Sequence, residues 1–180
     1  MPRALTPFTA ITWVFATLLV VAGAHKVAAP DATTAALQGA RLPSDHWLVR
    51  VLGAAEVAVG LAVVVVGGTV PSAIMAVMYA GFAGFVARQS GRGEDCGCFG
   101  SQPAPATRLH VGVNAIAAVA AAAAAVAPGP SLPAAFGAAP LTGALTIGLL
   151  ALAVAGVRLL LTALPSLAAT TARLLEEGRA

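Results

Sequence analysis

Five long apolar stretches, almost free of charge, decide what this chain can fold into. A helix that crosses the hydrocarbon core of a bilayer needs about 20 mostly apolar residues. Charged residues make up only 9% of the chain and the mean hydropathy is +0.90, whereas about a quarter of a soluble domain is charged. The sequence therefore predicts an all-α, polytopic transmembrane helix bundle, with spans at about 8–28, 47–66, 72–87, 109–127 and 141–161.

The basic residues indicate an orientation for this bundle. With five spans, all of the ten Lys and Arg residues except Arg3 fall on the side that holds the first loop, the third loop and the C-terminal tail. The positive-inside rule places that side in the cytoplasm. The formal net charge of +3 is small and dispersed, so nucleic acid is not among the predicted partners.

The only two cysteines lie one residue apart in Cys96-Gly97-Cys98-Phe99-Gly100, a break between the third and fourth spans. A disulfide needs Cα atoms about 4.4–6.8 Å apart, which residues this close reach only in a bend that Gly97 permits. Strained disulfides are the labile, catalytic ones, so a redox-active pair is the leading interpretation. The alternatives are a structural turn and a metal site. No metal is assigned, because zinc prefers four ligands at recognisable spacings.

This interpretation conflicts with the charge-based orientation. Thiols that oxidise exported proteins should face the oxidising exterior, whereas cytosolic thiols are kept reduced. The cytoplasmic side is the orientation that the charge count favours, and the chemistry of the cysteines favours the other.

Glu56 is the strongest candidate for a functional residue after the cysteines, because it lies inside the second span. A carboxylate in the bilayer costs about 2.5–3.5 kcal/mol on insertion scales and is a functional candidate by default. It could carry protons during thiol oxidation or accept a hydrogen bond from a polar ligand. The structural alternatives are a buried pair with Lys26, Arg50 or Asn114, and a protonated carboxyl bonded between helices.

Other polar side chains should share the membrane face of the cysteines, because the span ends that carry them lie on that side: His25, Lys26, Arg50, Arg88, Arg108, His110 and Asn114. His25, Lys26 and Asn114 are the candidate cofactor-binding residues. Snorkelling to the interface would equally explain the first two, and hydrogen bonding between helices the third. His110 receives no role. Small residues at 53–55, Gly81 and Gly84 favour tight helix packing.

The pattern as a whole resembles the MauE/DoxX family of small redox-associated membrane proteins. Ala22-Gly23-Ala24-His25-Lys26 closes the first span, and residues 53–61 are similar to the family's glutamate-containing second helix. Asp95-Cys96-Gly97-Cys98-Phe99-Gly100 follows the third span, and Asn114 lies near the start of the next. The resemblance covers roughly residues 8–127.

The resemblance implies a four-helix membrane bundle. MauE is associated with methylamine utilisation, in the maturation of the disulfide-rich beta subunit of methylamine dehydrogenase, and DoxX-like relatives are linked with quinone-dependent sulfur redox chemistry. By that resemblance Cys96 and Cys98 exchange disulfides with a thioredoxin-like or maturing exported protein, and quinone is the candidate cofactor. The fifth span departs from this plan.

The predicted organisation is therefore a MauE/DoxX-like core at 1–128, a loop and an additional span at 129–164, and a short polar tail at 165–180. The predicted function is that of a membrane thiol–disulfide redox protein that supports the maturation of partner proteins, with Cys96, Cys98 and Glu56 as catalytic residues. The alternative is a non-catalytic assembly factor or chaperone with structural cysteines. The expected location is the cell membrane, where the lipid bilayer and a second copy of the chain join the candidate partners.

Overall fold

The computed structural model describes residues 7–91 and 106–177, so Cys96 and Cys98 lie outside the described residues. Within that part of the chain there is no strand and there are seven α-helices: α1 (Pro7–Ala28), α2 (Asp31–Gly39), α3 (His46–Leu61), α4 (Thr69–Ser90), α5 (Arg108–Val126), α6 (Leu132–Ala138) and α7 (Pro140–Glu177). A π-helical segment, η1 (Ala62–Val66), extends α3.

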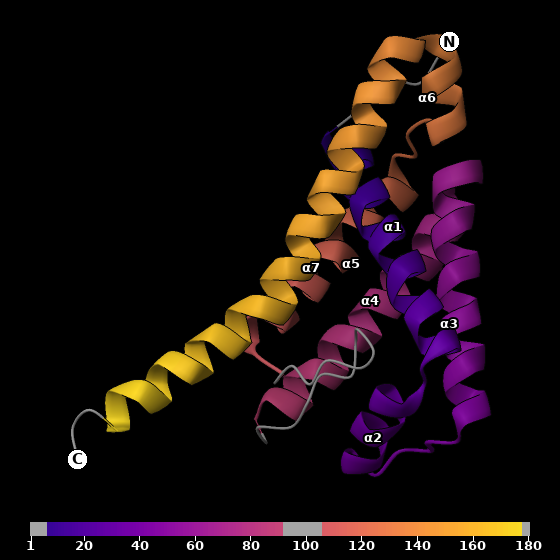
Figure 1. Cartoon of the computed structure of the whole chain (residues 1–180). Helices are drawn as coiled ribbons and strands as arrows, with labels where there is room; N and C mark the ends of the chain where they lie inside the picture. Colours follow the sequence, from indigo (N-terminus) through magenta and orange to yellow (C-terminus); the bar gives the residue numbers. More distant parts are fainter. Residues whose placement is uncertain (1–6, 92–105, 178–180) are drawn as a thin grey trace.

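Five of these segments are long and apolar enough to cross a membrane: Phe8–Ala28, His46–Val66, Thr69–Ser90, Arg108–Val126 and Gly143–Leu161. They run alternately up and down through the molecule (Figure 1). The prediction of an all-α polytopic bundle is confirmed, and the chain is a multi-pass membrane protein.

The helix α1 occupies the centre of the bundle. It packs closely against α3 and also contacts α5 and α7, while α4 and α5 form a second close pair. Buried side chains from five elements meet around it, among them Phe15, Met75, Tyr79, Ala117 and Val154. Large apolar side chains on the outside, such as Val77 and Leu152, are exposed, as lipid-facing residues are in a bilayer.

Glycines set the close approach of α1 and α3. A Cβ atom added to Gly23 would lie 2.5 Å from the Gly53 carbonyl oxygen, and one added to Gly53 would lie 2.6 Å from the Gly23 carbonyl oxygen. Tight packing at Gly53 is therefore confirmed. The same prediction is wrong for Gly81 and Gly84, because a Cβ atom on either residue would meet nothing within 4 Å. These two glycines face away from the neighbouring helices of the chain.

The turn between the second and third spans also requires glycine. Gly67 and Gly68 have φ angles of 69° and 96°, a region that side chains with a Cβ atom rarely occupy. This turn reverses the chain within two residues and brings α4 back beside η1.

Three features of the fold were not evident in the sequence. The first loop contains α2, and the uncharged loop after α5 contains α6. In addition, α7 continues through Pro165 to Glu177, so the fifth span and the predicted tail form one helix. Short helices such as α2 and α6 have too few turns to produce a clear apolar period.

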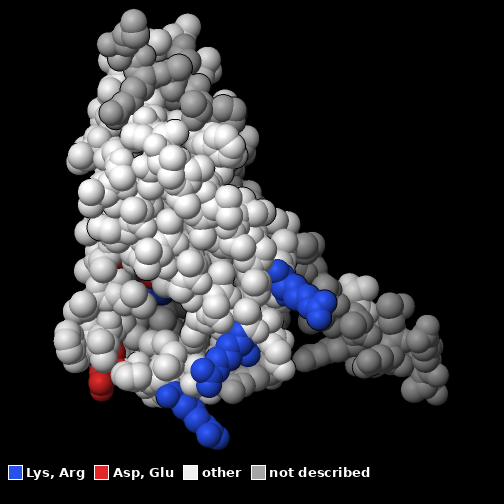
Figure 2. All heavy atoms as spheres, turned by 180° about the vertical axis from the view of Figure 1, so that it is seen from behind, with Lys and Arg blue, Asp and Glu red and all other residues white. Residues whose placement is uncertain are grey.

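Charged side chains gather at one end of the bundle. That end holds the end of α1, the helix α2, the start of α3, the end of α4 and the start of α5. Figure 2 shows the Lys and Arg side chains confined to this half of the visible face. We refer to it below as the charged end.

Candidate functional site

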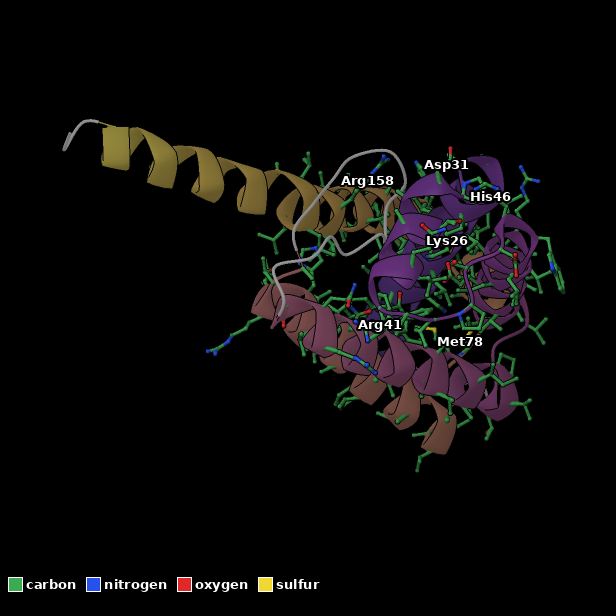
Figure 3. All side chains as sticks on the ribbon, turned by 90° about the horizontal axis from the view of Figure 1, so that it is seen from below. Lys26, Asp31, Arg41, His46, Met78 and Arg158 are labelled. Carbon is green, nitrogen blue, oxygen red and sulfur yellow. The ribbon has the colours of Figure 1, made fainter. Side chains whose placement is uncertain are left out.

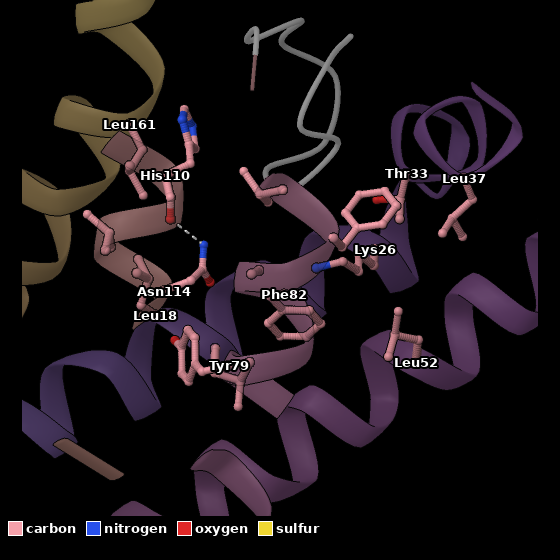
Figure 4. A pocket seen from close by; sticks show the side chains of 15 residues that line it. Leu18, Lys26, Thr33, Leu37, Leu52, Tyr79, Phe82, His110, Asn114 and Leu161 are labelled. Carbon is pink, nitrogen blue, oxygen red and sulfur yellow. Dashed lines mark hydrogen bonds between the residues drawn. The ribbon is translucent and has the colours of Figure 1, made fainter. Parts of the chain in front are cut away.

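A cavity of about 240 Å³ opens between the helices near the charged end. Figure 4 shows side chains from α1, α2, α3, α4, α5 and α7 around it. Apolar residues form most of its wall, among them Leu18, Leu52, Phe82, Val86 and Leu161. The polar residues on the wall are Lys26, Thr33, Tyr79, His110 and Asn114.

A buried ion pair borders this cavity. The Lys26 ammonium donates to Glu56 Oε2 at 2.9 Å, and the two side chains are 8% and 0% exposed. Among the described residues, Glu56 Oε1 has no hydrogen-bond partner. Seen from the charged end, Lys26 lies inside the bundle, whereas Asp31 and His46 form an exposed pair (Figure 3). The Glu56 carboxylate is thus held in the membrane by a counter-charge from α1.

The glycines of α1 and α3 explain why this pair forms. Gly23 and Gly53 let the two backbones touch, and Lys26 and Glu56 each follow three residues after one of them. Residues three apart lie on the same face of a helix. The close contact therefore brings the two charged side chains together in the seam.

Lys26 also faces the cavity. Its ammonium lies 5.7 Å from the centre of the Phe82 ring, within the range of a cation–π contact. An ammonium has three donors, of which one is used by Glu56 Oε2. Lys26 is therefore a hydrogen-bond donor that the cavity can offer to a ligand.

Asn114 and His110 lie one turn apart on α5 and both line the cavity. The Asn114 amide nitrogen donates to the His110 carbonyl oxygen at 2.7 Å, and Figure 4 shows the amide oxygen on the cavity side. Tyr79 is occupied elsewhere, because its hydroxyl donates to the Phe15 carbonyl oxygen at 2.7 Å. The cavity thus presents a cationic donor from Lys26 and an amide acceptor from Asn114 within largely apolar walls.

The structure brings together only part of the polar set expected from the sequence. Lys26, His110 and Asn114 line the cavity, and Glu56 lies behind Lys26. His25 does not line it: its Nδ1 hydrogen-bonds to the Val21 carbonyl oxygen at 2.8 Å, and its Nε2 lies 3.4 Å from Arg158 Nη2. Three arginines expected at the same pocket are exposed instead: Arg50, Arg88 and Arg108.

Several residues of the site were missed. His110 had received no role, although it precedes Asn114 by four residues and therefore shares its helix face. Tyr79 is the only tyrosine of the chain, and a hydroxyl in the middle of a span was a usable signal. No sequence signal marked Leu161 or Phe82, because an apolar residue in an apolar span looks the same whether it lines a cavity or faces lipid.

Comparison with known proteins identifies one family. The family model described as "Methylamine utilisation protein MauE" matches residues 5–128. The match ends before α6 and α7 begin. No curated protein and no solved structure matches the chain.

Proposed function

The chain belongs to the MauE family, and from that premise we propose that it is a membrane thiol–disulfide redox protein that supports the maturation of exported proteins in methylamine utilisation. By resemblance, the beta subunit of methylamine dehydrogenase is the partner. The observation that carries the proposal is that the cysteine-bearing segment joins two helices, α4 and α5, whose ends border the cavity with Phe85 and His110.

In the proposed cycle, a partner thiolate attacks one sulfur of a Cys96–Cys98 disulfide. That S–S bond breaks, a mixed disulfide forms, and the other cysteine leaves as a thiolate. The second partner thiolate then attacks the partner sulfur of the mixed disulfide and releases the first cysteine. The partner has lost two electrons and two protons, and the Cys96–Cys98 pair has gained them.

The size of the cavity supports a ring compound as the electron acceptor. An engineered cavity of about 150 Å³ binds benzene, and sites for drug-sized ligands measure about 300–1,000 Å³. At about 240 Å³, the cavity suits one substituted ring, with its apolar tail left in the bilayer. A bound quinone would accept the two electrons and two protons that the thiol pair releases.

The residues around the cavity have separate tasks in this proposal. Lys26 would donate a hydrogen bond to an oxygen of the ring, and the Asn114 amide oxygen would accept one from a hydroxyl of the reduced ring. Glu56 holds the ammonium in place through Oε2, while Oε1, which has no partner among the described residues, can take a proton. His25 contributes to the junction with α7 instead of to the cavity.

Single Cys96→Ser and Cys98→Ser variants of the full chain test the chemistry. We expect each to abolish partner oxidation, and one of the two to accumulate a mixed disulfide with the partner that reducing agent releases. Ser101→Ala, in the same segment, is the matched control. Unchanged oxidation in both cysteine variants would refute the proposal. A loss of protein abundance with unchanged oxidation per molecule would favour the assembly-factor alternative.

Labelling of intact cells with a membrane-impermeant maleimide tests the side of the membrane. Oxidation of exported proteins requires that Cys96 and Cys98 be labelled from outside, and only after reduction. That result would also mean that the protein departs from the positive-inside rule, because the basic residues of the charged end would then face the exterior. A reduced pair that is labelled only after the cells are opened would contradict the proposal.

A further inference from the structure

The short helix α2 forms the wall of the cavity between α3 and α4. Thr33 and Leu37 are four residues apart, and so on one face of α2, and they line the cavity together with Leu52 of α3 and Phe82 of α4. The helices α3 and α4 share few contacts with each other. They diverge towards the charged end, and α2 lies between their ends (Figure 1). On this side α2 closes the cavity, as α7 does where Leu161 lines it.

Single polar contacts join α2 to its two neighbours. Asp31 lies 3.1 Å from His46 of α3 in an exposed pair, and such pairs contribute little. On the other side, Gln89 Nε2 of α4 donates to the Ala36 carbonyl oxygen at 3.2 Å. That carbonyl also accepts from the Ala40 N–H at 3.1 Å, so it stays paired when the bond to Gln89 breaks. Neither contact commits α2 strongly to its closed position.

Two buried polar atoms oppose that position. Within the described part of the chain, Thr34 Oγ1 and Gln89 Oε1 are buried and have no hydrogen-bond partner. Thr34 belongs to the buried side of α2, and Gln89 is 0% exposed near the end of α4. A buried polar group without a partner loses the hydrogen bonds that water would give it. Both atoms regain them when α2 moves outwards, which offsets part of the free energy gained by packing α2.

The backbone lets α2 move as a unit. The N–H groups of Arg41 and Leu42 donate to the carbonyl oxygens of Gln38 and Leu37, each at 2.9 Å, and Arg41 has a φ of 58°. This is the Schellman arrangement that completes the end of a helix from its own backbone. At its start, only residues 29 and 30 separate α2 from α1. The helix therefore keeps its own hydrogen bonds when it lifts.

We propose that α2 is a lid, and that a ring-sized apolar ligand enters the cavity between α3 and α4 when this lid lifts. The pairs α1–α3 and α4–α5 stay in place, because each is closely packed. Thr34 and Gln89 do not line the cavity, so they are positioning residues that set how often the lid opens. The proposal rests on the proposed use of the cavity as a ligand site.

The rate at which a thiol inside the cavity is alkylated tests the lid. Ala22 lines the cavity and is 8% exposed, so Ala22→Cys in a Cys96→Ser/Cys98→Ser background reports how often a ring reaches it. The probe is N-ethylmaleimide, a small membrane-permeant ring compound, added to the full chain in nanodiscs at pH 8.

Two isosteric variants should change this rate in opposite directions. Gln89→Glu must either lose the donor to the Ala36 carbonyl oxygen or take up a proton to keep it, so alkylation should quicken roughly 2- to 12-fold, as the loss of one hydrogen bond implies. Thr34→Val removes the unpaired Oγ1 and should slow alkylation roughly 5-fold or more.

Matched exposed residues provide the controls. Gln38→Glu on the outer side of α2 and Thr69→Val at the start of α4 make the same chemical changes at exposed positions and should leave the rate unchanged. A general loosening of the fold cannot explain slower alkylation in Thr34→Val. Unchanged rates in both Gln89→Glu and Thr34→Val, or faster alkylation in Thr34→Val, would overturn the proposal.

A second measurement follows the position of α2 directly. Spin labels at Ala35 and Ala87, both exposed, report the distance between α2 and α4 in the Cys96→Ser/Cys98→Ser background. Gln89→Glu should broaden the distance distribution towards longer values, and Thr34→Val should narrow it. A distribution that neither variant changes would refute the lid, whatever the cysteines do.

Protection by duroquinone separates the lid from the proposed function. This fully substituted quinone does not add to thiols, and when it is bound in the cavity it should shield the Ala22→Cys thiol from N-ethylmaleimide. Shielding would support both proposals. No shielding, together with rates that respond to Thr34→Val, would contradict the quinone as ligand and still support the lid.

Discussion

The central helix α1 has two seams that are built on different principles. Against α3, backbone touches backbone at Gly23 and Gly53, and the Lys26–Glu56 pair is enclosed between the helices. Against α7, contact is made by side chains, chiefly Val154 and the approach of Arg158 to His25. In a bilayer the hydrophobic effect does not drive helices together, so close packing and polar pairs decide which helices associate. The α3 seam has both close backbone packing and a buried polar pair, whereas the α7 seam depends on side-chain packing.

The cavity therefore has two kinds of wall. Backbone contact and an ion pair hold the α3 seam, which we call the rigid seam, whereas side-chain packing holds the α7 seam. Lys26 lines the cavity from the rigid seam, where Glu56 is the partner of its charge. Leu161 lines it from α7. The rigid seam also lies within the residues that match the MauE family, whereas α7 lies beyond them. Substitutions in the two seams should therefore differ in cost.

The largest effect is expected for Glu56→Leu, which leaves the Lys26 ammonium buried without a counter-charge. Breaking a buried ion pair costs about 3–5 kcal/mol, whereas replacing both partners with apolar residues is close to neutral. The free energy of unfolding, measured by SDS titration in mixed micelles, should fall by that amount and recover in Lys26→Met/Glu56→Leu.

The recovered double variant then separates stability from chemistry. If it folds but no longer oxidises a partner, the pair serves the reaction as well as the fold. A single Glu56→Leu variant as stable as the wild type would contradict the rigid-seam interpretation. His46→Gln, which breaks the exposed pair with Asp31, is the control and should leave stability unchanged.

The next largest effect is expected for Gly53→Ala. The added methyl group would lie 2.6 Å from the Gly23 carbonyl oxygen, and overpacking of this kind costs about 1–3 kcal/mol. Gly84→Ala is the matched change on an open surface and should have no measurable cost. Equal behaviour of the two variants in the same titration would show that backbone contact does not set the seam.

A smaller effect is expected in the α7 seam. Val154→Ala removes two buried methyl groups that pack towards α1. Losing one such group costs about 0.5–1.5 kcal/mol in a soluble core, and because lipid replaces water around the separated helices, we expect a total of roughly that size here. Leu152→Ala, on the lipid-facing side of the same helix, is the control. A loss as large as that of Glu56→Leu would abolish the distinction between the two seams.

The smallest effect is expected for Tyr79→Phe, which removes the hydroxyl that donates to the Phe15 carbonyl oxygen. Hydrogen bonds between helices in a membrane are worth about 0.6 kcal/mol on average, and the Phe15–Tyr79 ring contact would remain. The unfolding free energy should change by about that amount. A much larger loss would mean that α4 is joined to α1 as firmly as α3 is.

The candidate site was predictable where a residue stood out chemically from its span. Glu56, Lys26 and Asn114 are polar groups in apolar stretches, and the cost of burying them marked them for attention. The sequence even named Lys26 as one possible partner of Glu56. Arg50, Arg88 and Arg108 lie at the same end of the bundle, yet they are exposed. A residue's position along a span does not decide whether its face of the helix turns inwards.

Membrane location, helical class and the five spans follow from the sequence by itself, because a chain with long uncharged apolar runs must satisfy its backbone hydrogen bonds within helices that cross the bilayer. The tertiary structure alone decided which glycines pack, which polar groups meet in the cavity, and that α7 closes it. In a membrane the outside of a helix is as apolar as its inside, so hydrophobicity marks a span without telling its two faces apart. That choice depends on backbone fit and on individual pairs such as Lys26–Glu56 and Tyr79–Phe15.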